Sequence, residues 1–125
     1  MQTVIVDTDI AIDYLRGLEY AMELMVGLWN RDSAYLSILS VYELFAGMKE
    51  KEMEHTENFI AACITEPVTI EIAKTAGDIY RRYRKEGVTL TPIDCLVNAT
   101  ALIRGHKIAT NNRSHYPDKK ILFHL

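Results

Sequence analysis

Close to the amino terminus lies the run Thr3-Val4-Ile5-Val6-Asp7-Thr8-Asp9, in which strand-favouring residues lead straight into acidic ones. An apolar run without polar alternation is typical of a strand buried on both faces, as in parallel sheets. Directly after it, apolar residues recur at helical spacing from Ile10 to Leu18. The pattern places Asp7 at the carboxyl end of a central strand, at the turn into a helix. In open α/β sheets, ligands bind at this position.

Length and composition limit the possible classes of protein. The 125 residues suffice for a single core, so we expect one domain over residues 1–125. Hydrophobic residues make up 49% of the chain, as in soluble globular proteins, and no segment resembles a signal peptide or a membrane span. The net charge of −3 means that a polyanionic substrate would need a local basic patch or a metal ion. Cys63 and Cys95 show no disulfide-framework spacing, which favours a reducing, cytoplasmic location.

Strand-like and helix-like segments alternate along the chain. Strands are expected at residues 3–6, 35–38 and 107–110, with a short strand near Pro67 and a closing strand at 121–123. Helices are expected at residues 9–16, 19–30, 71–85 and 92–105, and a capping box at residues 40–43 is expected to open another. The helix at 19–30 is apolar over most of its surface, which predicts deep burial or packing against a partner subunit. The alternation predicts a three-layer α/β/α sandwich with a central parallel sheet.

Three acidic residues share one position in this scheme. Asp7 follows a strand, and Glu43 and Asp94 are each expected in the first turn of a helix, at the same edge of a parallel sheet. Three carboxylates there would repel one another and raise each other's pKa, a conflict that a divalent cation such as Mg²⁺ would remove. Asn112 would add a neutral oxygen ligand. Taken singly, each acidic residue fits a structural role at a helix start more readily, because negative charge suits the helix dipole.

Four segments in a fixed order add a family resemblance to this pattern. They are VIVDTDI (residues 4–10), VYEL (41–44), DCLVNATA (94–101) and TNNRSHY (110–116). They resemble the motif blocks of the PIN-domain ribonucleases, and among these the VapC-like toxins of toxin–antitoxin systems. The resemblance spans essentially the whole chain, and four weak blocks in the right order make it specific.

The resemblance implies a PIN-like fold and a Mg²⁺- or Mn²⁺-dependent endoribonuclease, a hydrolase that acts on RNA. The catalytic, metal-binding positions would be Asp7, Glu43, Asp94 and Asn112, supported by Thr8, Asp9 and Thr110. Relatives more often carry Ser or Asn at the position of Asp9, which we therefore assign to a supporting role. The implied partners are an RNA substrate, a cognate antitoxin, and a second copy in a homodimer or a larger complex with the antitoxin. No membrane is implied.

Four cationic residues are candidates for RNA contact. Arg16, Lys49 and Arg113 lie next to motif blocks, and Arg82 belongs to a cationic helix end that more often is simply solvated. His115 fits a structural hydrogen bond at least as well as a proton-transfer role.

Two alternative functions stay open at this point. One is an aspartyl phosphatase that uses the Asp7-Thr8-Asp9 triplet, although such enzymes generally have longer chains. The other is an inactive PIN module that binds RNA or protein, against which the intact acidic positions argue.

Overall fold

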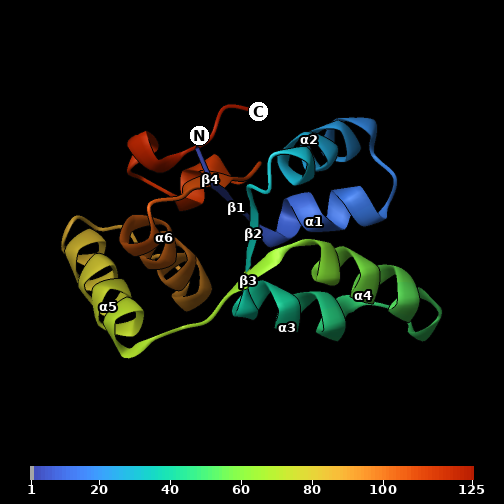
Figure 1. Cartoon of the computed structure of the whole chain (residues 1–125). Coiled ribbons are helices and arrows are strands. Elements are labelled where there is room, and N and C mark those ends of the chain that lie inside the picture. Colours follow the sequence, from blue (N-terminus) through green and yellow to red (C-terminus); the bar gives the residue numbers. More distant parts are fainter. Residues whose placement is uncertain (1) are drawn as a thin grey trace.

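A parallel sheet between two layers of helices forms the centre of the protein in the computed structural model, which describes residues 2–125 (Figure 1). The strands are β1 (Val4–Val6), β2 (Ala34–Ser37), β3 (Ile64–Glu66) and β4 (Lys107–Ala109). They lie in the order β3-β2-β1-β4, and every pairing is parallel. In this register, Val4 pairs with Ala34 on one side and with Lys107 on the other. The predicted α/β/α sandwich is confirmed.

Helices cover both faces of this sheet (Figure 1). On one side are α1 (Thr8–Leu15), α2 (Glu19–Asn30), α3 (Ile38–Gly47) and α4 (Met53–Ala62), and on the other are α5 (Ile70–Lys85) and α6 (Pro92–Arg104). Short 3₁₀ helices lie in the connections: η1 (Glu50–Glu52), η2 (Arg113–His115) and η3 (Lys119–Ile121). Within residues 2–125, no helix combines the length and the apolar character needed to cross a membrane.

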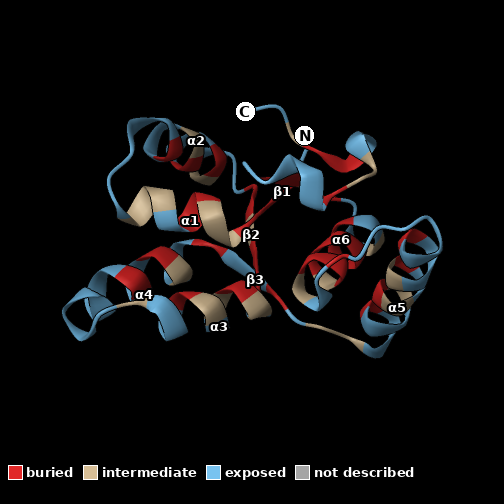
Figure 2. Ribbon diagram, turned by 180° about the vertical axis from the view of Figure 1, so that it is seen from behind, coloured by how far each residue is buried: buried red, intermediate tan, exposed pale blue. Residues whose placement is uncertain are grey.

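The central strand β1 is buried on both faces, as its apolar sequence predicts (Figure 2). Val4 and Val6 pack into a core shared with α1, α2, α3 and α4. Ile5, which points to the opposite face, packs with Ile108 and Tyr116 on the α6 side. This alternation fixes the strand between the two layers and delivers Asp7 to the carboxyl edge of the sheet.

Packing between α5 and α6 follows the predicted helical stripe. Ile72, Ala76, Ile79 and Tyr83, at helical spacing on α5, are all buried and form a third core cluster with residues of α6. The stripe therefore places α5 as an outer layer whose cationic face remains in solvent.

The start of α3 differs from the prediction. Ser37 is the N-cap, and its hydroxyl accepts a hydrogen bond from the Leu39 amide at 3.1 Å, so the helix begins at Ile38 rather than after residue 40. The predicted capping box of Ser40 with Glu43 is therefore wrong, and Glu43 does not lie in the first turn. The reason is that β2 leads directly into α3 without a loop, and the earlier serine takes the cap.

The predicted closing strand at 121–123 is also wrong. Residues Lys119–Ile121 form η3, in which the Asp118 side chain accepts a hydrogen bond from the Lys120 amide. Only an isolated bridge between Ile108 and Leu122 joins this segment to the sheet. The turn formed by Asp118 shortens the segment too much for a strand.

Helix α2 is buried on one face only. Ala21, Met25 and Leu28 are buried in the core, whereas Met22 and Val26 are 44% and 50% exposed. Of the two predicted outcomes, deep burial does not hold, and an apolar face of α2 is left at the surface.

Candidate active site

A cavity of about 570 Å³, called the carboxylate cavity below, opens at the carboxyl edge of the sheet. Its lining comprises Asp7, Thr8, Asp9, Glu43, Thr91, Pro92, Ile93, Asp94, Asn112 and His115. Four of these side chains are carboxylates, from the N-cap and first turn of α1, from α3 and from α6, so residues far apart in the sequence meet at one place. The structure thus brings together all four predicted catalytic positions, with Thr8 and Asp9 beside them.

Asp7 lines this cavity and is only 7% exposed. As the N-cap of α1, it accepts a hydrogen bond from the Thr8 amide through Oδ1 at 2.8 Å. Its Oδ2 accepts hydrogen bonds from the hydroxyls of Thr110 at 2.8 Å and Tyr116 at 3.1 Å. These donors fix the carboxylate in one orientation, as expected for a preorganised ligand.

Glu43 reaches the cavity from α3, one turn deeper in the helix than predicted. The Thr8 hydroxyl donates to Oε1 of Glu43 at 2.6 Å and lies 2.9 Å from the Ser40 hydroxyl. Thr8 therefore ties the start of α1 to α3, and its role in supporting the site stays a prediction.

Asp94 is the third carboxylate, in the first turn of α6, and is 9% exposed. The helix begins there because Thr91 caps it by accepting the Asp94 amide hydrogen bond at 3.1 Å. Burial is the main cause that raises the pKa of Asp94, and the negative charge of Asp7 raises it further, whereas hydrogen bonding by Thr91 and the charge of His115 oppose the shift. The fold thus holds two carboxylates closer than their charges favour.

Asp9 has a different environment from the other acidic residues. Its Oδ1 accepts the Ile10 amide hydrogen bond at 2.9 Å and its Oδ2 accepts that of Asn111 at 2.8 Å. Burial raises the pKa of Asp9, and the Asn111 hydrogen bond opposes that shift. Because both oxygens hold backbone amides, Asp9 anchors the loop that carries Asn112. This arrangement does not suit the second carboxylate of an aspartyl phosphatase.

Thr110, at the end of β4, lies beneath the cavity and not in its lining. It is fully buried, donates to Asp7, and accepts the Asn112 amide hydrogen bond at 3.0 Å. One hydroxyl therefore connects the first and the last predicted ligand positions.

Tyr116 and His115 contribute contacts that the sequence does not reveal. The fully buried Tyr116 hydroxyl hydrogen-bonds to Asp7 and lies 3.5 Å from Oδ1 of Asp94, and burial, with both charges, raises the pKa of Tyr116. His115 Nδ1 lies 3.0 Å from Oδ2 of Asp94. The contact of His115 with Asp94 is of the structural kind that the sequence allows for this residue. The contacts of Tyr116 become visible only in the folded structure.

The donor set of the cavity fits a hard divalent cation in its chemistry. Its lining offers carboxylate and amide oxygens, and the mutual repulsion of Asp7 and Asp94 is a conflict that a cation would remove. In this conformation, no three His, Cys, Asp or Glu side chains of residues 2–125 converge as ligands of one ion. Glu43 is engaged by Thr8, and Asp94 by His115. Since Mg²⁺ retains several waters, few direct protein ligands are needed.

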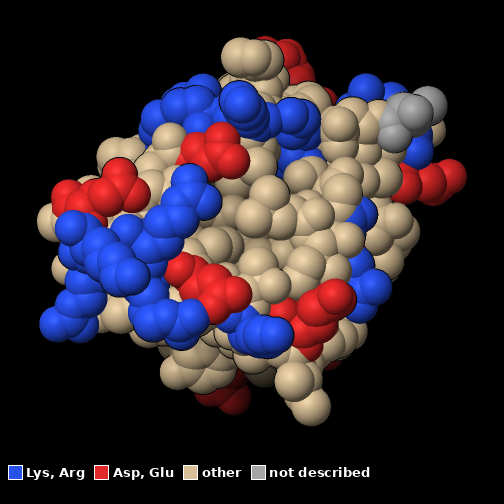
Figure 3. Space-filling model, turned by 90° about the vertical axis from the view of Figure 1, so that its left-hand side faces the viewer, with Lys and Arg blue, Asp and Glu red and all other residues tan. Residues whose placement is uncertain are grey.

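The candidate RNA-binding residues are divided between two regions. Arg16 and Lys49 line a smaller cavity that shares Glu43 with the carboxylate cavity, and Arg113 directly follows Asn112. Arg82 lies on α5, with its guanidinium carbon 5.1 Å from the centre of the Tyr83 ring, and does not line either cavity. Figure 3 views the α5 and α6 side and shows Lys and Arg side chains gathered in groups around an uncharged area.

Comparison with known proteins gives a consistent assignment. The family described as PIN domain matches residues 4–118. Ribonuclease VapC19 of Mycobacterium tuberculosis is 36% identical over 114 residues, which cover 90% of this chain and 91% of that protein.

Two solved structures share the fold at low sequence identity. DNA-bound VapBC from Salmonella typhimurium has a TM-score of 0.84 at 20% identity, covering 98% of this chain and 96% of that chain. A toxin–antitoxin complex from Klebsiella pneumoniae has a TM-score of 0.83 at 17% identity, covering 98% and 97%. The match to the PIN-domain family over residues 4–118 and the 36% identity to VapC19 decide the family assignment. The chain belongs to the PIN-domain family, in its VapC ribonuclease branch.

Proposed function

We propose that this protein is a metal-dependent endoribonuclease toxin that hydrolyses RNA phosphodiester bonds. The observation that carries the proposal is the meeting of Asp7, Glu43, Asp94 and Asn112 in one cavity, from four separate parts of the chain. Family membership supports the reaction class, since the relative VapC19 is a ribonuclease.

Asp7, Glu43, Asp94 and Asn112 would hold the cation. When bound there, Mg²⁺ or Mn²⁺ would supply a Lewis acid at the scissile phosphate and favour deprotonation of the attacking water. The proposed reaction forms a bond from the water oxygen to phosphorus and breaks the bond to the 3′ oxygen. The products are a 5′-phosphate and a 3′-hydroxyl.

The chain's own residues keep these groups in place. Thr110 and Tyr116 orient the Asp7 carboxylate, and Thr8 orients Glu43. A carboxylate of the cavity accepts the proton of the attacking water, and the departing 3′ oxygen takes up a proton from solvent. Asp9 holds the loop of Asn112 through the Asn111 amide.

Purified protein and labelled single-stranded RNA test the proposal. Cleavage is expected with Mg²⁺ or Mn²⁺, is expected to stop on addition of EDTA, and should return when excess Mn²⁺ is restored. Mapping of the ends should find 5′-phosphates. Cleavage that persists in EDTA, or ends that carry a 2′,3′-cyclic phosphate, would refute metal-assisted attack by water.

We further propose that a small antitoxin protein neutralises the enzyme. The fold is shared with VapBC from Salmonella typhimurium and with a toxin–antitoxin complex, which supports such a partner. A short open reading frame next to the gene would encode it. Co-expression of that product should give a stable complex without RNase activity, and an uncomplexed, active enzyme would contradict the proposal.

Homodimerisation is proposed on the exposed apolar face of α2. Met22 and Val26 are about half exposed there and lie along an open cavity of about 550 Å³. We expect a dimer in sedimentation equilibrium and a monomer for Val26→Glu. A monomeric wild-type protein would contradict this assignment.

A further inference from the structure

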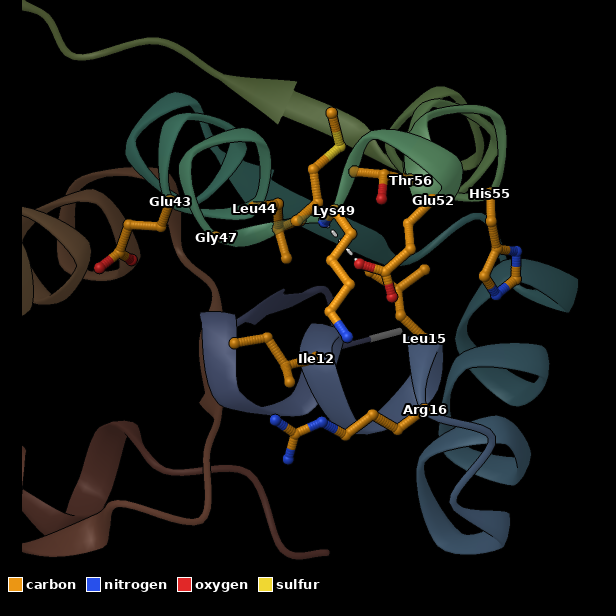
Figure 4. A pocket seen from close by; sticks show the side chains of 11 residues that line it. Ile12, Leu15, Arg16, Glu43, Leu44, Gly47, Lys49, Glu52, His55 and Thr56 are labelled. Carbon is orange, nitrogen blue, oxygen red and sulfur yellow. Dashed lines mark hydrogen bonds between the residues drawn. The ribbon is translucent and has the colours of Figure 1, made fainter.

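A second cavity, of about 290 Å³, lies between α1, α3 and the segment that leads into α4 (Figure 4). Its lining includes Ile12, Leu15, Arg16, Leu44, Lys49 and His55. Glu43 lines both this cavity and the carboxylate cavity, so the two hollows are neighbours on one surface. A chain that occupies one can therefore extend into the other.

Two cations face this second cavity from different elements. Arg16 is the C-cap of α1, and Lys49 is the N-cap of η1. The ammonium group of Lys49 extends towards α1 in Figure 4. Among residues 2–125, neither cation forms an ion pair, whereas Arg81 on α5 pairs with Asp78. Unpaired cations that converge on a concave site raise the local concentration of anions.

The acidic residues of the lining already have partners inside the protein. Glu52 accepts the Lys49 amide hydrogen bond at 2.6 Å, and Glu43 accepts that of the Thr8 hydroxyl. In Figure 4, Glu43 points out of this cavity, away from Lys49 and Arg16. Arg16 and Lys49 are therefore the cationic donors that the cavity offers to an anionic ligand, beside His55, which also lines it.

The remaining wall of the cavity is apolar. Ile12 and Leu15 come from α1, and Leu44 from α3, and Ile12 is 37% exposed. A fitting ligand thus combines an anionic group with an apolar surface. The volume lies at the lower end of small-molecule sites, roughly 300 Å³, which suits one nucleotide unit rather than a longer segment.

We propose that this cavity is a nucleotide subsite for the RNA strand, next to the phosphodiester that is cleaved. Arg16 and Lys49 bind a flanking phosphate, and the apolar wall contacts the base or the ribose of the same nucleotide. The inference rests on the proposed RNase function and extends it, since the carboxylate cavity itself repels RNA and affinity must come from its flanks. It also separates Arg16 and Lys49 from Arg82, which lines neither cavity.

Binding of a short labelled single-stranded RNA, measured by fluorescence anisotropy without metal over a series of salt concentrations, tests the subsite. Arg16→Gln/Lys49→Gln should lower the affinity about tenfold or more, because two charge-assisted contacts are lost. The slope of log K against log salt should become less negative by about 0.7, the value for one phosphate contact of a single strand. The matched control is Lys74→Gln/Lys85→Gln, which removes two exposed cations of α5 with the same change of net charge.

A second measurement separates the subsite from the catalytic proposal. For wild-type protein, kcat/KM should be greater for a longer RNA than for a dinucleotide. Arg16→Gln/Lys49→Gln should lose most of that gain, whereas the control Lys74→Gln/Lys85→Gln should keep it. The charge-preserving Arg16→Lys/Lys49→Arg should retain most of the affinity. A wild-type protein that cleaves no RNA would refute the function, and the anisotropy data would still decide on the subsite. If Arg16→Gln/Lys49→Gln has the same affinity and salt slope as the control variant, the cavity is not an RNA subsite. A protein partner would then be the alternative occupant.

Discussion

The hydroxyl of Tyr116 donates a hydrogen bond to Oδ2 of Asp7 at 3.1 Å, although the two residues are 109 positions apart. The same hydroxyl lies 3.5 Å from Oδ1 of Asp94. One fully buried phenol thus lies between two carboxylates that repel one another. The contact sets their orientation before any cation or substrate arrives, in the way that outer hydrogen-bond partners orient metal ligands.

Removal of this hydroxyl should weaken metal binding while the fold is kept. Tyr116→Phe retains the buried ring and loses only the donor to Asp7 and Asp94. We expect the affinity for Mn²⁺, measured by calorimetry on the protein without RNA, to fall about tenfold, at the lower end of the effect of such partners. Tyr80→Phe, on α5, is the matched control, because the Tyr80 hydroxyl accepts a hydrogen bond from Arg84 at the protein surface, away from the carboxylates. Equal Mn²⁺ affinity of Tyr116→Phe and the control would refute the positioning role.

The raised pKa of Asp94 has a defined consequence for stability. Burial, with the charge of Asp7, makes the folded protein keep a proton on Asp94 at pH values where the unfolded chain has lost it, since the ordinary pKa of this carboxyl is 3.8. The favourable contribution of this group is therefore complete below pH 3.8 and is lost as the pH rises through the raised value. Without metal at neutral pH, Asp94→Asn should melt a few degrees above the wild type, and the difference should vanish in acid.

Added metal should reverse this order. A cation that binds only the folded state raises the melting temperature of the wild type by mass action, and Asp94→Asn should gain less. Thermal melts with and without Mn²⁺, over a pH series, measure both effects. A wild type that is more stable than Asp94→Asn in EDTA at neutral pH would contradict the assignment of Asp94 as a strained carboxylate.

A second buried acidic residue, Glu66, supports the fold and not the site. Its Oε2 lies 2.6 Å from Nε2 of His106, whose Nδ1 lies 2.6 Å from the Thr3 hydroxyl. His106→Ala leaves Glu66 buried without this partner and should lower the free energy of unfolding by about 2 kcal/mol. Arg104→Ala, which removes a more exposed cation 3.8 Å from the same carboxylate, should cost about 0.5 kcal/mol or less. Urea denaturation measures both, and similar losses for the two variants would contradict the role of His106.

Sequence patterns predict the layers and the sheet correctly where burial dictates composition. The unbroken apolar run of β1 and the helical stripe of α5, from Ile72 to Tyr83, each correspond to a buried surface. The common edge of Asp7 and Asp94 follows from a strand end and a first helical turn in a parallel α/β fold, and the shared cavity agrees with it. Glu43 reaches the same cavity although its predicted place in the first turn of α3 is wrong. Their roles as metal ligands stay predictions.

Details that depend on competing local contacts could not be predicted in this way. Ser37 and Ser40 are both good caps three residues apart, and only the direct passage from β2 into α3 selects Ser37. Residues 121–123 have the composition of a strand, but Asp118 folds the preceding segment into a turn. Tyr116 closes the motif block at 110–116, but its contacts with the two carboxylates have no local signal, because these partners come from the β1–α1 turn and from α6.

The central claim is that Asp7 and its neighbours hold the cation with which RNA is cleaved. The most direct measurement is the Mn²⁺-dependent rate of RNA cleavage by Asp7→Asn, compared with Asp32→Asn in an exposed turn outside the cavity. Asp7→Asn should lose at least about 100-fold in rate, because the loss of a ligand removes several kcal/mol of transition-state stabilisation, while Asp32→Asn should match the wild type. Full Mn²⁺-dependent cleavage by a folded Asp7→Asn protein would contradict the assignment.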